Sequence, residues 1–227
     1  MAIVWPCPAS VAAYARAGRA VVVPRPDCAG CGLAMTFWSG YWRHVRDEGR
    51  CVKIFVRRAR CGGGCAATHA LLPAFVLAGR LDVTATVGAV LEDVVDGPGG
   101  VRPAAARAGV PYSTARGWLR RFGMRASEVA VGFAALTVEL GGDAPSLGGG
   151  VGGGGRVRAL AALRCAYGAA TALPGWAALG LWRFVSCGSG GRLLAANTVS
   201  LWLVVGKRRF LPPVPATGRP EGGRDGP

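Results

Sequence analysis

The sequence predicts an α+β fold, in which a small metal-bound β-hairpin precedes a mainly α-helical module. Two close pairs of cysteines, at 28–31 and 61–65, flank a stretch with the alternating pattern of β-strands. From 82 to 140, apolar residues recur instead at helical spacing. A glycine-rich linker and an apolar, poorly defined helical segment follow. These observations set the expected order of the domains.

The four paired cysteines form the clearest pattern in the chain. Two tight turns can each present two sulfurs to one ion, and four thiolates complete the closed tetrahedron of a structural zinc site. We therefore expect a zinc ribbon that binds structural Zn²⁺ through Cys28, Cys31, Cys61 and Cys65. Three glycines separate the second pair, and we expect them to widen its turn by adopting positive φ angles.

Two other interpretations of these thiols stay open. Cys51 and His69 are alternative ligands, although a capping or core role is favoured for His69. The clustered thiols could instead be buried or redox-active groups without a metal. The cysteines at 7, 165 and 187 are expected to be small apolar residues.

Alternating segments predict the strands, and a turn is expected at 47–49. The third strand presents an apolar face made of Val52, Ile54 and Val56. The predicted strands are 20–23, 35–46 with a bend at Ser39-Gly40, and 51–57.

The apolar run that follows the second cysteine pair is predicted to be a helix over 70–78. Pro73 would lie in its first turn, and Gly79 would end it. Further helices are predicted at 82–96, within 101–122, at 126–140 and at 156–172.

The segment 102–122 has the pattern of a helix-turn-helix. This motif needs small residues where its helices cross, a glycine in the turn and apolar residues beyond it. Ala104, Ala105 and Ala108 meet the first need and Gly109 the second. The expected buried stripe consists of Val110, Ala115, Trp118, Leu119 and Phe122.

The outward face of the second helix, which Pro111 is expected to start, would enter a DNA major groove. Ser113 and Thr114 suit phosphates or base edges, and Arg116 suits a guanine. A helical hairpin used only for packing is the alternative. The candidate DNA-binding residues are Tyr112, Ser113, Thr114, Arg116, Arg120, Arg121 and Arg125, with Arg57, Arg58 and Arg60 added by the ribbon.

Composition shifts suggest where the domains begin and end. Nine glycines between 141 and 155 predict a linker, because such a segment loses too much entropy on packing. The expected parts are a 1–19 extension, the zinc ribbon with its following helix at 20–79, the helix-turn-helix domain at 80–140, the linker at 141–155, an apolar segment at 156–211 and a disordered tail at 212–227.

The chain is strongly basic, with 27 lysines and arginines against 12 acidic residues and a formal charge of +15. Arginine binds phosphate in a bidentate manner, so nucleic acid is the first partner to consider. GC-rich codon usage is an alternative explanation for the abundance of arginine. No secretory signal is recognisable, a membrane span is not expected, and reduced cysteines in the cytoplasm favour metal ligation over disulfides.

With these residues in view, the chain resembles uncharacterised actinobacterial proteins that join a zinc ribbon to a helix-turn-helix. It is also similar to the DNA-binding front end of insertion-sequence transposases. The resemblance covers roughly 20–125. It rests on Cys28-x-x-Cys31, Trp42-Arg43, Arg57-Arg58-x-Arg60-Cys61, the 68–73 run, Gly109-Val110-Pro111, Trp118 and Arg120-Arg121-Phe122.

We therefore expect a cytoplasmic, nucleoid-associated, zinc-stabilised protein that binds double-stranded DNA as a regulator or mobile-element accessory factor. It is not expected to be an enzyme, because too few acidic residues follow the helix-turn-helix to build a two-metal transposase centre. Besides DNA, a second copy of the chain or a transposase is a possible partner. The alternatives are a non-catalytic transposase or recombinase fragment or subunit and a protein-binding zinc-ribbon adaptor that uses Trp176, Trp182 and Trp202.

Overall fold

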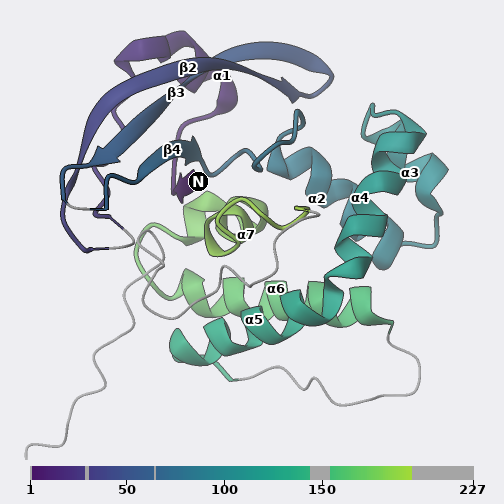
Figure 1. The fold of residues 1–227 in the computed structure, drawn as a ribbon. Coiled ribbons are helices and arrows are strands. Elements are labelled where there is room, and N and C mark those ends of the chain that lie inside the picture. The colour runs from purple at the N-terminus through teal and green to yellow at the C-terminus, as the bar shows by residue number, and fades with distance from the viewer. Residues whose placement is uncertain (1, 29–30, 64, 144–153, 196–227) are drawn as a thin grey trace, which may run out of the picture.

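The computed structural model describes residues 2–28, 31–63, 65–143 and 154–195. Its fold is α+β, with a four-stranded sheet next to a layer of helices (Figure 1). The strands are β1 (Ala2–Trp5), β2 (Met35–Asp47), β3 (Arg50–Cys61) and β4 (Thr68–Pro73). The helices are α1 (Val11–Ala17), α2 (Thr84–Val95), α3 (Val101–Arg107), α4 (Tyr112–Met124), α5 (Ala126–Glu139), α6 (Gly155–Thr171) and α7 (Leu181–Gly188), with short 3₁₀ turns at Gly18–Ala20 and Ala177–Leu179.

The long β2–β3 hairpin is the largest part of the sheet, whose strand order is β1-β4-β3-β2. The predicted turn is present, with Glu48 and Gly49 at positive φ. A register shift between Phe37 and Ser39 produces the bend that was expected at Ser39-Gly40. β4 runs antiparallel to β3, and β1 pairs in parallel with β4. The hairpin is thus built into a larger sheet.

Two predicted elements near the hairpin are wrong. The 20–23 segment is not a strand, because Ala20 ends the 3₁₀ turn and the residues at 21–23 are irregular. The 70–78 segment is not a helix, because its first residues belong to β4. Leu71 pairs with Arg57 on one side and with Ile3 on the other, and Pro73 ends the strand. The partner strand β1, which the sequence pattern did not reveal, stabilises this extended conformation.

The two faces of the sheet are covered differently (Figure 1). On one face lies α1, whose Tyr14 is fully buried and donates a hydrogen bond from its hydroxyl to the Phe55 carbonyl over 3.2 Å. On the other face lie the helices, and the Ser186 hydroxyl of α7 donates to the Val76 carbonyl over 2.8 Å. The β2–β3 hairpin therefore has an α1 side and a helical side.

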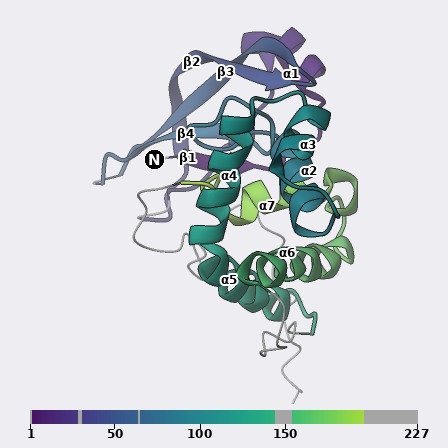
Figure 2. The ribbon, with the colours of Figure 1, turned by 90° about the vertical axis from the view of Figure 1, so that its right-hand side faces the viewer.

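The helices pack around one continuous apolar core. α5 and α6 lie side by side (Figures 1 and 2) and bury Val129, Phe133, Leu160 and Leu163. α6 agrees with the helix predicted at 156–172. Most of the 141–155 stretch, the rest of the apolar segment beyond 195 and the 212–227 tail lie outside the described residues. Within the described part, no helix is long and apolar enough to cross a membrane.

The turn end of the hairpin is joined to the segment before α2. The Arg46 guanidinium forms an ion pair with Asp82 at 2.6 Å, and the Arg46 backbone exchanges hydrogen bonds with Leu81 and Val83. Both cysteine pairs lie at the opposite end of the hairpin, about 40 Å away along a strand of 13 residues. The cysteine turns therefore do not form this joint with the helical module.

Candidate metal centre and basic helical surface

Backbone hydrogen bonds shape the two cysteine turns. In the first, the Cys28 amide donates to the Leu33 carbonyl, and the Gly32 amide donates to the Cys28 carbonyl. In the second, which follows β3 directly, the Cys61 amide donates to the Ala67 carbonyl. These bonds bring both ends of each turn together, so each turn holds two sulfurs close to each other.

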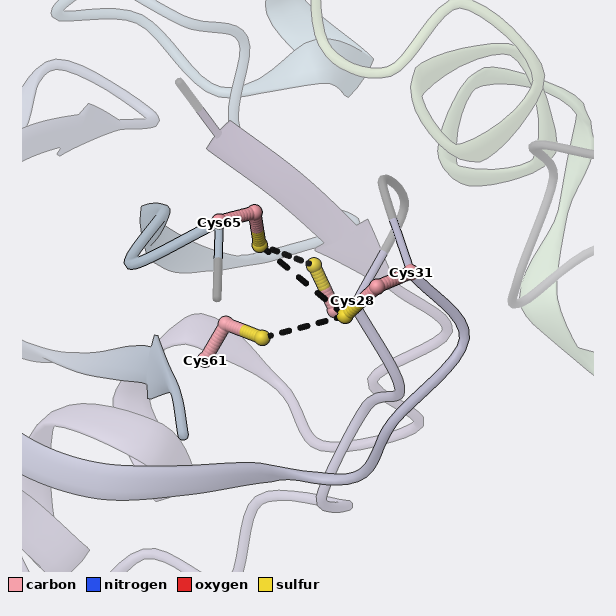
Figure 3. A group of neighbouring side chains, drawn as sticks. All are labelled: Cys28, Cys31, Cys61 and Cys65. Atoms are coloured by element: carbon pink, nitrogen blue, oxygen red, sulfur yellow. Dashed lines mark hydrogen bonds between the residues drawn. The ribbon is translucent and has the colours of Figure 1, made fainter. Parts of the chain in front are cut away.

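The four sulfurs of Cys28, Cys31, Cys61 and Cys65 point toward one another (Figure 3) and all lie within 4.8 Å of one another. The Sγ atoms of Cys28 and Cys65 are 3.3 Å apart, and Cys31 Sγ lies 3.3 Å from Cys61 Sγ and 3.9 Å from Cys65 Sγ. Four sulfurs around one zinc ion at about 2.3 Å would be about 3.8 Å apart. The cluster is close enough to bind a metal ion.

Cys28 and Cys61 are buried, whereas Cys31 and Cys65 are exposed. Hydrogen bonding with the Cys31 and Cys65 thiols raises the pKa of Cys61 to about 12. The proton is retained because loss of it would place a negative charge among neighbouring sulfurs. A bound cation would reverse that preference and hold the sulfurs as thiolates.

Gly63 leaves space between the two turns. A Cβ atom at this position would lie 2.8 Å from Leu33 Cδ1 and 3.3 Å from Cys31 Sγ. The expectation that Gly62 and Gly63 adopt positive φ is wrong; Ala66, with φ of 45°, takes that role in the turn. Gly63 is needed for space rather than for its backbone freedom, and Gly64 lies outside the described residues.

The alternative ligands do not join the cluster of described residues. Cys51 pairs with Arg46 near the opposite end of the hairpin. His69 is buried in β4, opposite Ala59, and its Nδ1 atom has no hydrogen-bond partner among the described residues. Burial lowers the pKa of His69, and the positive charge of Arg192 acts in the same direction. His69 is therefore a neutral core residue.

α3 and α4 form a pair of helices joined by a short turn. The Val110 amide donates to the Ala105 carbonyl over 3.0 Å, and Gly109 adopts a φ of 63°, a combination that ends a helix and redirects the chain. Pro111 precedes the first residue of α4 as its cap. The crossing residues Ala104 and Ala105 are buried. So is the expected stripe of Val110, Ala115, Trp118, Leu119 and Phe122.

The outward face of α4 borders two hollows. One, of about 680 Å³, is lined by Tyr112, Ser113, Arg116, Gly117, Arg120 and Arg121. The other, of about 840 Å³, also reaches Arg116 and Arg120 and extends to Arg156 at the start of α6. Among the described residues, no acidic side chain lines either hollow. α4 thus presents a basic surface beside α3 (Figure 2).

The other predicted contacts of α4 differ in accessibility. Thr114 and Arg121 are half-buried, whereas Arg116 and Arg120 are exposed. Arg125 is not available for phosphates as expected, because it is buried, donates to the Ala195 carbonyl and pairs with Glu128. It stabilises the start of α5.

Arg156 belongs to the basic surface, but no pattern in the sequence around it predicts this position. Its guanidinium lies across Gly123 of α4, where an added Cβ would be 2.7 Å from its Nε. The packing of α6 on α5 brings this arginine to α4 from the far side of the glycine-rich stretch. A local sequence window does not contain that information.

The three arginines at the end of β3 do not share one face. Arg57 pairs with Gly40 and Arg58 with Ser39, so they point to opposite sides of the sheet, and Arg60 lies on the side of Arg58. Arg57 donates to the Arg19 carbonyl on the α1 side, whereas Arg58 donates to the Thr68 hydroxyl. They provide charge on two separate surfaces.

The aromatic residues expected to bind a partner protein are largely enclosed. Trp176 is buried, and Trp182 packs on Gly88 and donates to the Glu92 carboxylate over 3.2 Å. Trp202 lies outside the described residues. Of the remaining cysteines, Cys7 is buried, Cys187 is partly buried and Cys165 is exposed.

No protein-family model matches the chain, and no curated protein or solved structure is significantly similar to it.

Proposed function

We propose that the protein is a zinc-stabilised DNA-binding protein in which α3 and α4 act as a helix-turn-helix. The observation on which this rests is the exposed face of α4, where Arg116 and Arg120 lie beside Tyr112 and Ser113, and where no described acidic residue lines either hollow. The buried face of the same helix fixes its orientation through Trp118, Leu119 and Phe122. A rigid helix with arginines on its free face suits a DNA major groove.

The charges on this surface suit different parts of DNA. Arg116 lies at mid-helix and is exposed, so it would contact a base edge. Arg120 and the half-buried Arg121 lie one turn later and would bind phosphates, as would Arg156 at the rim. The net charge of +15 would increase the rate of encounter with DNA.

Zinc is the metal that the cysteine cluster would bind. Four thiolates select soft metals, and a tetrahedral four-sulfur set leaves no open position for a substrate. The ion would be structural. It would tie the first cysteine turn to the end of β3, close to the start of β4.

DNA binding is tested by selecting a preferred duplex from a random pool and measuring its affinity by fluorescence anisotropy. Arg116→Ala is expected to weaken binding to the selected site by about 1–3 kcal/mol, and binding to random duplex much less. Arg121→Ala should weaken both and lower the salt slope by about one.

Arg16→Ala serves as the matched control, because it removes one exposed arginine from α1, on the other side of the sheet. It should change both affinities only slightly. If Arg116→Ala and Arg16→Ala lose equally little affinity, α4 is not the DNA-binding element.

Metal content is the test of the zinc site. The purified protein should contain one zinc per chain, and Cys31→Ser should lose it. Cys51→Ser, an exposed cysteine outside the cluster, should retain it. A folded protein free of zinc, or one that loses zinc with Cys51→Ser, would rule out the four-cysteine site.

A DNA-binding subunit of a transposase would use the same α4 surface. A strand-transfer assay with and without a divalent metal separates that role from regulation, because only a transposase complex joins DNA ends.

A further inference from the structure

The α1 side of the β2–β3 hairpin has a surface of aromatic and cationic residues that the α4 site does not use. The register places Trp42 opposite Phe55, His44 opposite Lys53 and Gly40 opposite Arg57. Alternation puts these pairs on one face. Arg19 and Arg25 reach the same face from the segment after α1. We call the set Arg19, Arg25, Phe37, Trp42, Lys53, Phe55 and Arg57 the hairpin face.

A cationic side chain lies over each aromatic ring of the hairpin face. Lys53 Nζ lies 5.5 Å from the centroid of Trp42, and Arg19 Cζ lies 5.5 Å from that of Phe55. Two arginines, Arg57 and Arg25, lie 5.4 and 5.9 Å from the centroid of Phe37. Such contacts hold the cations over the rings and keep their charge on the surface.

The arrangement is fixed by close packing. A Cβ at Gly40 would lie 2.3 Å from Phe55 Cζ, so the glycine lets the ring lie across β2. Trp42 packs edge-on against Phe55, with centroids 5.3 Å apart. The Arg57 guanidinium donates to the Arg19 carbonyl over 2.7 Å. Trp42 is therefore held in place while 41% of it stays exposed.

The charge of the hairpin face is not neutralised within the described part of the chain. None of Arg19, Arg25, Lys53 and Arg57 forms an ion pair there; the ion pairs of that part involve Arg46, Arg107, Arg125 and Arg164. Cationic side chains without ion-pair partners, next to an exposed indole, are complementary to a polyanion whose aromatic faces are accessible. A single-stranded polynucleotide has both, whereas a duplex hides the faces of its bases.

We propose that the hairpin face binds single-stranded nucleic acid, with a base stacked on Trp42 and phosphates on Arg19, Lys53 and Arg57. The site is on the α1 side of the sheet, whereas α4 lies on the other side (Figure 1), so it is separate from the α4 surface and does not depend on the proposed duplex binding. The face presents no hydroxyl or amide side chain to recognise a ribose 2′-OH, so DNA and RNA strands should bind comparably.

The test is fluorescence anisotropy with labelled 15-mers of oligo(dT) and oligo(U) and with a 15-bp duplex. Trp42→Ala is expected to weaken binding of both single strands by about five- to a hundredfold, since loss of one base–aromatic stack has that size. Trp42→Phe, which keeps a ring and the fold, should restore most of the affinity. Arg57→Ala should lower the salt slope by about 0.7.

Trp38→Ala is the matched control. Trp38 is 53% exposed but stacks on Arg58, on the other face of the hairpin. This variant should bind single strands as the wild type does, and Arg116→Ala should affect only the duplex. Equal losses in Trp38→Ala and Trp42→Ala, or no single-strand binding at low salt, would overturn the proposal. Failure of duplex binding alone would leave it standing.

Discussion

Gly88 of α2 lies where the indole of Trp182 crosses the helix. A Cβ at this glycine would be 2.2 Å from three atoms of the ring. The ring also donates from Nε1 to Glu92 Oε2, one turn further along α2. A helix interior normally disfavours glycine, so its presence here reflects the space that Trp182 requires.

Gly88→Ala is therefore expected to destabilise the protein by about 1–3 kcal/mol, because Trp182 must move and lose its bond to Glu92. Gly168→Ala provides the contrast. Gly168 is an exposed position in α6 with no atom within 4 Å of its added Cβ, so alanine should stabilise the helix by about 0.5–1 kcal/mol. Urea unfolding of both variants measures the difference, and similar effects in both would contradict the packing argument.

His69 makes the stability of the folded protein depend on pH. Because burial lowers its pKa in the folded state, the unfolded chain takes up a proton first as the pH falls. The stability that neutral His69 contributes is complete above a pH of about 6.5, which is the ordinary pKa of histidine. It is lost as the pH falls below that value.

We expect the melting temperature to fall more steeply between pH 7.5 and 5.5 in the wild type than in His69→Leu, at constant zinc. His44→Leu, the same change at the exposed histidine of β2, should keep the wild-type slope. Parallel curves for the wild type and His69→Leu would show that another group determines the acid response.

Among the elements, the hairpin and the helices α2 to α6 were predictable because their signals are local, whereas α1 and α7 were not predicted. Alternation around Ile54 and Val56 defines β3, and the spacing of Trp118, Leu119 and Phe122 defines the buried side of α4. The four clustered cysteines also follow from spacing. β4 was not predictable, since its Leu71 and Leu72 form a short apolar run that fits helix or strand equally. Pairing with β3 on one side and with β1, nearly 70 residues earlier, on the other decides between them.

The position of the cysteine cluster predicts which elements a bound metal stabilises. Cys61 ends β3, and the second turn leads within a few residues to β4. At the other end of the hairpin, the Arg46–Asp82 pair acts without the metal.

With zinc bound as proposed, its removal by a chelator should therefore increase amide exchange at 31–36 and 59–70 much more than at 44–52. Hydrogen-exchange mass spectrometry with and without the chelator measures this, with Cys31→Ser as the metal-free reference. An equal increase in amide exchange along the whole hairpin would contradict a local effect of the metal.

At the scale of the whole molecule, the helices on either side of the glycine-rich stretch share one core. Phe184 of α7 is fully buried and contacts the rings of Phe133, Tyr167 and Trp176. α7 also reaches the beginning of the chain, where Arg183 donates to the Cys7 carbonyl over 3.0 Å. The surface joining α4 to Arg156 depends on this packing, which is why local sequence patterns did not reveal it.

Co-expressed fragments 1–147 and 148–227 should therefore copurify as a stable complex. Phe184→Ala in the second fragment should weaken the association, because loss of a buried aromatic ring costs about 3–5 kcal/mol. Size-exclusion chromatography with mass spectrometry measures the complex. A first fragment that is folded and monomeric on its own would contradict the shared core.

The bond from Ser186 to the Val76 carbonyl spans 110 residues, and this separation has a consequence during synthesis. The cysteines at 28–65 leave the ribosome long before α7 does, so the nascent chain can close its metal site while the helical side of the sheet is still bare. Until the chain beyond α7 emerges, the apolar surface around Val4 lacks its contact with Gly191. Such a surface on a growing chain is the kind that chaperones bind, so the yield of folded protein should depend on how quickly translation reaches residue 190.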